Sequence, residues 1–447
     1  MKSLRIASGA GFQGDRLDPA IRVAKRGQVN YIVFECLAEA TLAMAQLRKL
    51  SDPALGFDPL LRARMEAILP VCTAKGIKIV TNMGAANPLQ AGRMVSEIAD
   101  AQCLDLKTFV VTGDDVLERV VREADRLEIM ENGKPLRAIK PMLVSANAYL
   151  GAEPTLEALN QGADVVITGR TCDPSLYLAP MMYEFGWSVT DWHLLGAGTV
   201  IGHLLECGGQ VSGGYFADPG YKDVPQLENL GAPVAEIDSD GSAIISKVPG
   251  SGGLVTCHTC KEQLLYEIHD PAQYLTADVV ADFSGVWFEK EGENRVRVLG
   301  GNGKPRTGTL KVSLGYRDGF IGDAGISYAG PGSYERAKLA GKIIERRVKL
   351  SGLKMDEMRL DYVGINSLHG PATPAIIEPY EVRLRAAIRT RNRLHAEEFV
   401  REVESLAVNG PYGGGGFRQG NRVEEVIAIC STLLDRNQVK TQIHEVA

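Results

Sequence analysis

Polar side chains stand directly after short apolar runs in the first 175 residues of this chain. Six such runs each finish in a small polar turn, and five of these turns contain glycine. Parallel neighbouring strands would gather these side chains at the carboxyl edge of one sheet, where open α/β sheets bind ligands. We therefore expect a small-molecule site there, with Asp114 among the substrate-binding residues. The polar residues at the strand ends are Glu35, Asn82, Asp114, Asp115, Asn147, Arg170 and Asp173.

These residue types suit a substrate that carries an anionic group or a carbonyl. We expect Arg170 to bind a carboxylate in bidentate fashion. Asn82 or Asn147 would donate to a developing enolate or oxyanion. Glu35 or Asp173 would act as the general base if apolar neighbours raise the carboxyl pKa. The alternative is structural, with Asp173 as a helix cap and the two asparagines as turn formers.

A glycine-rich turn follows the first apolar run. The segment SGAGFQGD fits G-x-G-x-x-G at Gly9, Gly11 and Gly14, and Glu35 follows at the spacing of a ribose-binding acid. Residues 15–19 separate these glycines from the next helix, whereas the dinucleotide fingerprint starts its helix inside them. Three interpretations stay open: a dinucleotide site, a plain turn with close backbone approach, and a loop that contacts another ligand through Gly11.

A histidine and a glutamate occur three residues apart in GTVIGHLLECGG, which places both on one helical face. His203 and Glu206 could form a general acid/base pair, or His203 could be a packed core histidine. The chain contains neither H-E-x-x-H nor G-x-S-x-G. These absences argue against a zincin-type metal site and an α/β-hydrolase triad.

The segment CHTC places Cys257 and Cys260 at a spacing used by zinc and redox sites. A structural zinc site needs a second pair of ligands, which the chain lacks. We therefore favour ordinary packed thiols and expect neither a metal nor a cofactor. Cys172, close to Arg170 and Asp173, is a better candidate for a reactive thiol.

Four successive glycines, Gly413–Gly416, lie in NGPYGGGGFRQGN near the end of the chain. Gly414 and Arg418 could belong to a flexible lid or to a loop that cradles an anion. A mobile surface loop explains the composition equally well.

Strand and helix patterns alternate in the N-terminal half, which predicts an α/β fold: a parallel sheet with helices on both faces, followed by α+β regions. A barrel would need eight strands where we count six. We predict a Rossmann-like domain over residues 1–190, a glycine-rich α+β region over 191–355, and a small β-α-β region over 356–447 packed on the rest. The strand candidates are Arg5–Ser8, Tyr31–Phe34, Ile77–Thr81, Thr108–Val111, Met142–Ser145 and Asp164–Thr168. The helix candidates are Pro19–Lys25, Ala38–Leu50, Leu60–Lys75, Gln90–Ala101, Val116–Leu127, Thr155–Gln161 and Pro174–Phe185.

Composition narrows the class of protein. The 447 residues are 45% apolar and 23% charged, as in an ordinary globular protein, and the formal net charge is −6. No lysine- or arginine-rich block is present, so we expect no nucleic-acid partner. The arginines within EVRLRAAIRTRNR alternate like the wet face of a strand. No apolar run is long enough to span a bilayer, and eight scattered cysteines are not a disulfide framework, so we expect a cytoplasmic protein without a membrane partner.

Several blocks of the chain resemble the acyclic terpene utilisation protein A family, over nearly the whole length. The resemblance implies a catabolic pathway that handles branched acyl-CoA intermediates, and no agreed reaction comes with it. The blocks are RIASGAGFQGD, GADVVITGRTCDPSL, ECGGQVSGGYFADPG, DSDGSAIISK and EQLLYEIHDPAQYLTADVVADF.

Two departures from the family pattern matter. Members carry apolar residues in place of Cys257, His258 and Cys260, which weakens the metal interpretation. Many members also have a further C-terminal domain, whereas this sequence ends soon after Gly413–Gly416. From this we expect a small partner protein in place of that domain, and an oligomer.

Three hypotheses about function follow. The first is a catabolic enzyme that acts on a small carboxylate or a branched acyl-CoA thioester by proton abstraction, with hydratase or lyase chemistry. The second is a non-catalytic large subunit or ligand-binding component that needs a small partner. The third is a nucleotide-phosphate-binding protein that uses residues 8–15.

Overall fold

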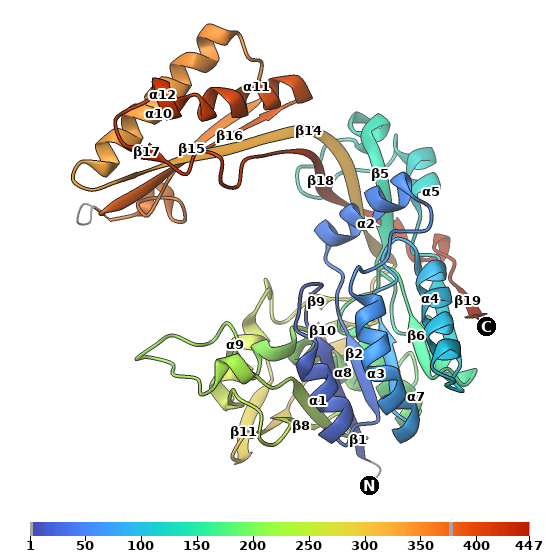
Figure 1. The fold of residues 1–447 in the computed structure, drawn as a ribbon. Coiled ribbons are helices and arrows are strands. Elements are labelled where there is room, and N and C mark those ends of the chain that lie inside the picture. Colours follow the sequence, from blue (N-terminus) through green and yellow to red (C-terminus); the bar gives the residue numbers. More distant parts are fainter. Residues whose placement is uncertain (1–2, 375–378, 447) are drawn as a thin grey trace. The chain divides into compact units, whose positions relative to one another are not determined.

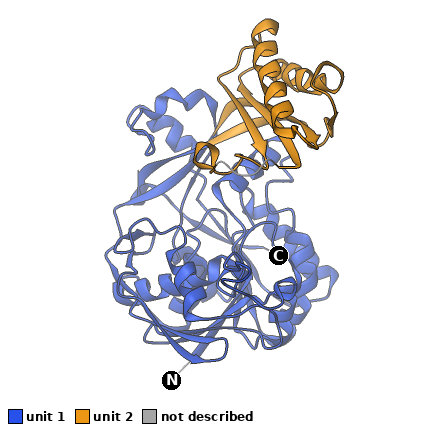
Figure 2. Ribbon diagram, turned by 90° about the vertical axis from the view of Figure 1, so that its left-hand side faces the viewer, with its two compact units in different colours: residues 1–315, 429–447 blue, residues 316–428 orange. Residues whose placement is uncertain are grey.

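The computed structural model describes residues 3–374 and 379–446. The chain forms two compact units, one built from residues 1–315 and 429–447 and the other from residues 316–428. Figure 2 shows the two units in different colours. The strands β14 (Thr309–Ala329) and β18 (Arg422–Asp435) each contribute residues to both units.

The first unit is built around a ten-stranded mixed sheet with the order β11-β12-β8-β7-β1-β2-β3-β6-β4-β19. Five neighbouring strands at its centre, β1, β2, β3, β6 and β4, run parallel. The outer strands are antiparallel. The strand bounds are β1 (Ser3–Ala10), β2 (Tyr31–Phe34), β3 (Lys78–Thr81), β4 (Thr108–Thr112), β6 (Val165–Ile167), β7 (Pro233–Asp238), β8 (Ala243–Lys247), β11 (Trp287–Gly292), β12 (Arg295–Leu299) and β19 (Gln442–Val446).

Helices cover both faces of this sheet, as the sequence predicts. One hydrophobic cluster contains buried residues of α1, α3 and α4, and another contains those of α6, α7 and α8. Along β2, Tyr31 and Val33 join one cluster while Ile32 and Phe34 join the other. Successive side chains of a strand point to opposite faces, so burial on both faces explains the unbroken apolar runs. The helix bounds are α1 (Asp18–Arg26), α3 (Leu61–Lys75), α4 (Pro88–Ala101), α6 (Glu153–Asn160), α7 (Ser175–Phe185) and α8 (Trp192–Glu206).

One predicted strand lies outside the parallel sheet. The apolar run at residues 142–145 belongs to β5 (Leu143–Ala148), which pairs with β14. The place between β3 and β4 is taken by β6, which forms parallel ladders with both. The parallel core therefore has five strands where the alternation predicts six. Periodicity indicates a strand but does not indicate its partner.

Smaller elements complete the first unit. Within the described residues, no helix has the length and apolar character to cross a membrane. The remaining elements are α2 (Glu39–Ser51), α5 (Leu117–Glu123), α9 (Cys257–Leu265), β9 (Tyr274–Leu275), β10 (Val280–Asp282) and β13 (Asn302–Lys304), of which the last three form a small sheet.

The second unit contains a sheet with the order β15-β16-β14-β17 and the helices α10, α11 and α12, whose apolar residues share one core. On the polar face of β16, Arg385 binds both Asp323 and Asp361, as expected for the wet face of a strand. Arg389 pairs with Asp318 at 2.7 Å. The element bounds are β15 (Glu357–Val363), β16 (Glu381–Thr390), β17 (Gly414–Gly415), α10 (Ser333–Ser351), α11 (Arg393–Glu404) and α12 (Leu406–Asn409).

Candidate active site at the carboxyl edge of the parallel strands

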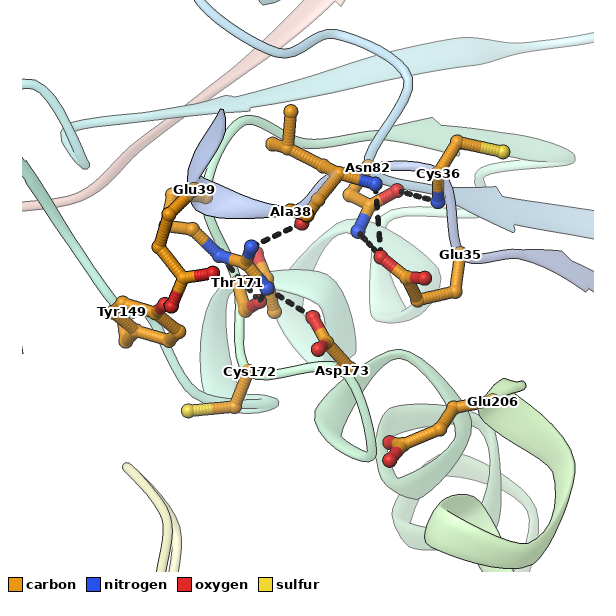
Figure 3. Close-up of polar contacts among 12 residues, drawn as sticks. Glu35, Cys36, Ala38, Glu39, Asn82, Tyr149, Thr171, Cys172, Asp173 and Glu206 are labelled. Atoms are coloured by element: carbon orange, nitrogen blue, oxygen red, sulfur yellow. Dashed lines mark hydrogen bonds and ion pairs between the residues drawn. The ribbon is translucent and has the colours of Figure 1, made fainter. Parts of the chain in front are cut away.

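Arg170 lies in the turn after β6, and its guanidinium is held by the chain itself. The residue is 1% exposed. Its Nε and Nη2 donate to the Thr171 carbonyl at 3.1 and 2.7 Å, and its Nη1 donates to the Leu37 carbonyl. The guanidinium also stacks 4.5 Å from the centre of the Tyr149 ring. These contacts fix the cation in one orientation. Figure 3 labels Thr171, Tyr149 and Asp173, three of the residues that contact it.

The Asp173 carboxylate pairs with Arg170 rather than capping the following helix. Its Oδ1 accepts from Arg170 Nη2. No side chain caps the start of α7, where Pro174 takes the N-cap position. Burial raises the pKa of Asp173, the Arg170 cation opposes this, and Glu39 raises it further. The Asp173 side chain is 38% exposed, so this carboxylate is the solvent-facing partner of a buried cation.

Glu35 follows β2 and is held by two N–H donors on one oxygen. Its Oε1 accepts from Asn82 Nδ2 and from the Leu37 amide, both at 2.9 Å. Burial raises the pKa of Glu35 to about 8, with a further rise from Asp173, while Arg170 and the two hydrogen bonds act in the opposite direction. Burial therefore raises the pKa of Glu35 by more than the Arg170 cation and the hydrogen bonds lower it, so this carboxyl group exchanges its proton close to neutral pH.

Asp114 and Asn147 are hydrogen-bonded to each other, and Asp114 also holds the turn that carries Arg170. Asp114 Oδ2 accepts from Asn147 Nδ2 at 2.8 Å and from the Arg170 amide at 2.9 Å. Both side chains are 3% exposed, and burial raises the pKa of Asp114 to about 6. A Cβ on Gly169 would lie 2.6 Å from the Asp114 carboxylate, so a larger residue there would displace this carboxylate. Asp115 instead accepts from the Leu117 amide at the start of α5.

Two site residues were missed from the sequence, Tyr149 and Glu39. The Tyr149 ring contacts two cations, Arg170 and Lys311, and the Lys311 Nζ is 4.9 Å from the ring centre. The Tyr149 hydroxyl donates to Glu39. Burial would raise the pKa of Glu39, but this hydrogen bond and the nearby cations lower it to about 2. The polar turn NAYLGAEP after β5 is the signal that could have indicated Tyr149.

His203 and Glu206 pair on one face of α8, as their spacing predicts. The distance between His203 Nδ1 and Glu206 Oε1 is 2.7 Å, and that between His203 Nε2 and the Gln263 carbonyl is 3.0 Å. Burial lowers the pKa of His203 to about 4. Burial and the charge of Asp173 raise the pKa of Glu206. Nε2–H donates to the Gln263 carbonyl, and the lowered pKa of His203 together with the raised pKa of Glu206 favours the uncharged form of both groups.

The glycine turn after β1 packs against the chain itself. The Gly11 amide donates to Asp15 Oδ2 at 3.0 Å, and a Cβ on Gly11 would lie 2.3 Å from the Cys207 carbonyl carbon. The neighbouring cavity has about 30 Å³, roughly the share of one water in the liquid. The helix α1 begins only at Asp18. These observations show the close backbone approach, and the helix does not start inside the glycines as the dinucleotide fingerprint requires.

The cysteines that the sequence suggests for metal binding or reactivity pack within the protein. Cys172 is buried, and burial raises its pKa to about 12. Cys260 is also buried, with its pKa raised to about 12, and Cys257 Sγ donates weakly to the Phe288 carbonyl at 3.8 Å. No group of three or more histidine, cysteine, aspartate or glutamate side chains in the described part of the chain could hold a metal ion.

The C-terminal glycine loop belongs to the second unit, whereas Arg170 and its partners belong to the first. Gly414 lies in β17 and pairs with Tyr328 of β14. The Arg418 guanidinium lies 5.5 Å from the centre of the Phe417 ring.

The fold and the site define an α/β protein with a buried cation and several perturbed carboxyl groups at the carboxyl edge of a parallel sheet. The model of the acyclic terpene utilisation family protein AtuA matches residues 4–445, and the chain belongs to this family. Membership implies a part in acyclic terpene utilisation. A comparison with curated proteins found no match.

Proposed function

We propose that this protein is a catabolic enzyme that acts on a small carboxylate or a branched acyl-CoA thioester by abstracting a proton beside the carbonyl, with hydratase or lyase chemistry. The observation that carries this proposal is the raised pKa of Glu35, about 8, close to a fixed buried Arg170. A carboxyl group that titrates near the working pH is suited to general acid–base catalysis.

Glu35 would carry the proton on its second oxygen. Oε1 is occupied by the donors Asn82 Nδ2 and the Leu37 amide. Both donors fix the carboxyl plane, so Oε2 is the oxygen left to exchange a proton with substrate. Asn82 is then a positioning residue, because its Nδ2 donates to Glu35 and its Oδ1 accepts from the Cys36 amide at 2.8 Å.

Arg170 would stabilise the negative charge that develops on the substrate oxygen. Its guanidinium is held by backbone carbonyls and the Tyr149 ring, so the cation needs little reorganisation during the reaction. Asp173 is the carboxylate partner of this cation, and its side chain is partly exposed. A substrate carboxylate or thioester oxygen would take the place of Asp173 on Arg170, with Asp173 turning toward solvent.

Hydrogen exchange tests this proposal without knowledge of the complete reaction. Branched acyl-CoA thioesters and small carboxylates are incubated with the protein in D₂O, and mass spectrometry counts the deuterium incorporated beside the carbonyl. We expect incorporation with at least one branched acyl-CoA. Glu35→Gln should abolish it, and Arg170→Lys should slow it by about 10²-fold, as for loss of an oxyanion-hole donor.

The matched control is Glu157→Gln, which changes an exposed carboxylate on α6 and should exchange at the normal rate. Equal exchange in Glu35→Gln and Glu157→Gln would refute the role of Glu35. If no compound of the panel shows deuterium exchange or a hydration product, the proposal that this protein is such an enzyme is refuted.

A further inference from the structure

A second feature of the first unit, away from Arg170, has the size of a ligand site. A cavity of about 630 Å³ is formed by the loop after β8, the hairpin of β11 and β12, and the start of α9. Sites for small molecules and cofactors have volumes of roughly 300–1,000 Å³. We propose that this cavity binds an organic phosphate of about nucleotide size.

The charged side chains that line the cavity favour an anion. Two lysines, Lys247 and Lys290, line the cavity with a single carboxylate, that of Glu293. Lys247 Nζ donates to the Ser251 carbonyl at 2.6 Å. This hydrogen bond holds the ammonium group in place and uses one of its three N–H groups, so the other two can bind a ligand. Lys290 is exposed and makes no side-chain hydrogen bond among the described residues. Lysine ammonium groups are common phosphate ligands.

Backbone N–H groups add to these cations. Cys257 and His258, both lining the cavity, are the first two residues of α9, whose amides have no acceptor inside the helix. Thr256 caps the helix through the Thr259 amide at 3.2 Å and so leaves those two amides to a ligand. At Gly250, another residue that lines the cavity, a Cβ would meet no atom within 4 Å, which shows open space there.

Strand register places this cavity at the same edge of the sheet as the candidate active site. Lys247, at the end of β8, pairs with Pro233 of β7, and the adjacent Val234 pairs with Ala7 of β1. The strand β1 is in turn parallel to β2, which ends just before Glu35. Three strand spacings separate β8 from β2, a distance of about 14 Å.

This separation suits a long ligand with the phosphate at one end and the reacting group at the other. An acyl-CoA thioester has that form. The assignment of the phosphate to the substrate rests on the proposed function, whereas phosphate binding by the cavity does not.

Calorimetric titration of the full chain with ADP, CoA and inorganic phosphate tests the proposal. We expect ADP and CoA to bind, and inorganic phosphate to compete with both. Lys290→Gln should weaken ADP binding about tenfold, and the double variant with Lys247→Gln should weaken it further. Lys261→Gln, an exposed lysine on α9 outside the cavity, is the matched control and should bind normally. Equal affinities of Lys290→Gln and Lys261→Gln, no binding of ADP or CoA, or no competition by phosphate would each overturn the proposal.

Two further readouts locate the ligand and separate the two proposals. ADP should protect Cys257, which lines the cavity, from alkylation and leave the exposed Cys103 unprotected. Equal protection of the two thiols would contradict the site. Glu35→Gln should bind ADP normally, because Glu35 does not line the cavity. Failure of deuterium exchange with intact ADP binding would therefore refute the proposed reaction and leave the cavity proposal standing.

Discussion

Asn82 connects two neighbouring turns by donating to Glu35 Oε1 at 2.9 Å while accepting from the Cys36 amide at 2.8 Å. Its side chain is fully buried, so both bonds form away from water. The hydrogen bond to Glu35 favours the charged form of that carboxyl group and lowers its pKa against the effect of burial. Asn82 thus tunes as well as positions Glu35.

Removal of Asn82 should therefore raise the pKa of Glu35 above about 8. In Asn82→Ala, the pH profile of deuterium exchange should shift to higher pH. The free energy of unfolding should fall by about 1–3 kcal/mol, because the Cys36 amide loses its acceptor. An unshifted exchange profile in a folded variant would contradict the tuning role.

Glu35 should make the protein less stable at alkaline pH. The folded protein binds this proton more tightly than the unfolded chain, with a pKa of about 8 against 4.5. The free energy of unfolding therefore falls as pH rises from about 4.5 to about 8, by at most ~1.4 kcal/mol per pH unit. Urea unfolding should show a shallower pH dependence in Glu35→Gln, and the normal one in the control Glu157→Gln. The same pH dependence in both variants would show that Glu35 does not titrate in this range.

His203 should act in the opposite sense and in the acid range. Its folded pKa, about 4, lies below the ordinary value of 6.5, so the folded protein binds this proton less tightly than the unfolded chain. The contribution of His203 to the free energy of unfolding is therefore full above about pH 6.5 and is lost as the pH falls toward 4. Urea unfolding at pH 4.5 and 7 should show a smaller acid loss in His203→Gln than in the control His269→Gln, an exposed histidine. Equal acid losses would mean that His203 is charged in the folded protein.

Gly11 is expected to matter for stability rather than for phosphate binding. An alanine Cβ would lie 2.3 Å from the Cys207 carbonyl carbon and 2.5 Å from the Gly208 amide nitrogen, and neither backbone atom can move freely. Gly11→Ala should lower the free energy of unfolding by about 1–3 kcal/mol, as overpacking does. Gly308→Ala, where a Cβ meets nothing within 4 Å, should stay within about 0.5 kcal/mol of the parent. Equal stabilities would contradict the packing of this turn.

The sequence predicts much of this site because strand ends are local features. Glu35, Asn82 and Arg170 each follow an apolar run, and a parallel sheet brings such positions to one edge. The contact of Tyr149 with Glu39 joins residues 110 positions apart, and no local pattern indicates it. Likewise, nothing in the alternation indicates that β6 lies between β3 and β4. The polar residues at the strand ends therefore predict where the candidate site lies. Which residues contact one another in it depends on strand pairing, which the sequence pattern does not indicate.

The sequence also does not predict which hydrogen bonds the side chains of Arg170 and His203 form. Bidentate binding of a ligand by Arg170 is a reasonable expectation from residue type, but backbone carbonyls of Thr171 and Leu37 already take most of its donors. His203 was a candidate base, yet both of its ring nitrogens are engaged. The small partner protein and the oligomer stay predictions.

Direct titration of Glu35 tests the central claim without any substrate. The protein is labelled with carbon-13 at the glutamate side-chain carboxyl, and its NMR signals are followed from pH 4 to 10 alongside those of Glu35→Gln. We predict one signal that titrates near pH 8 and is missing from the variant. If the signal lost in Glu35→Gln titrates near the ordinary value of 4.5, Glu35 is a plain carboxylate at neutral pH, and the account of the proton carrier is wrong.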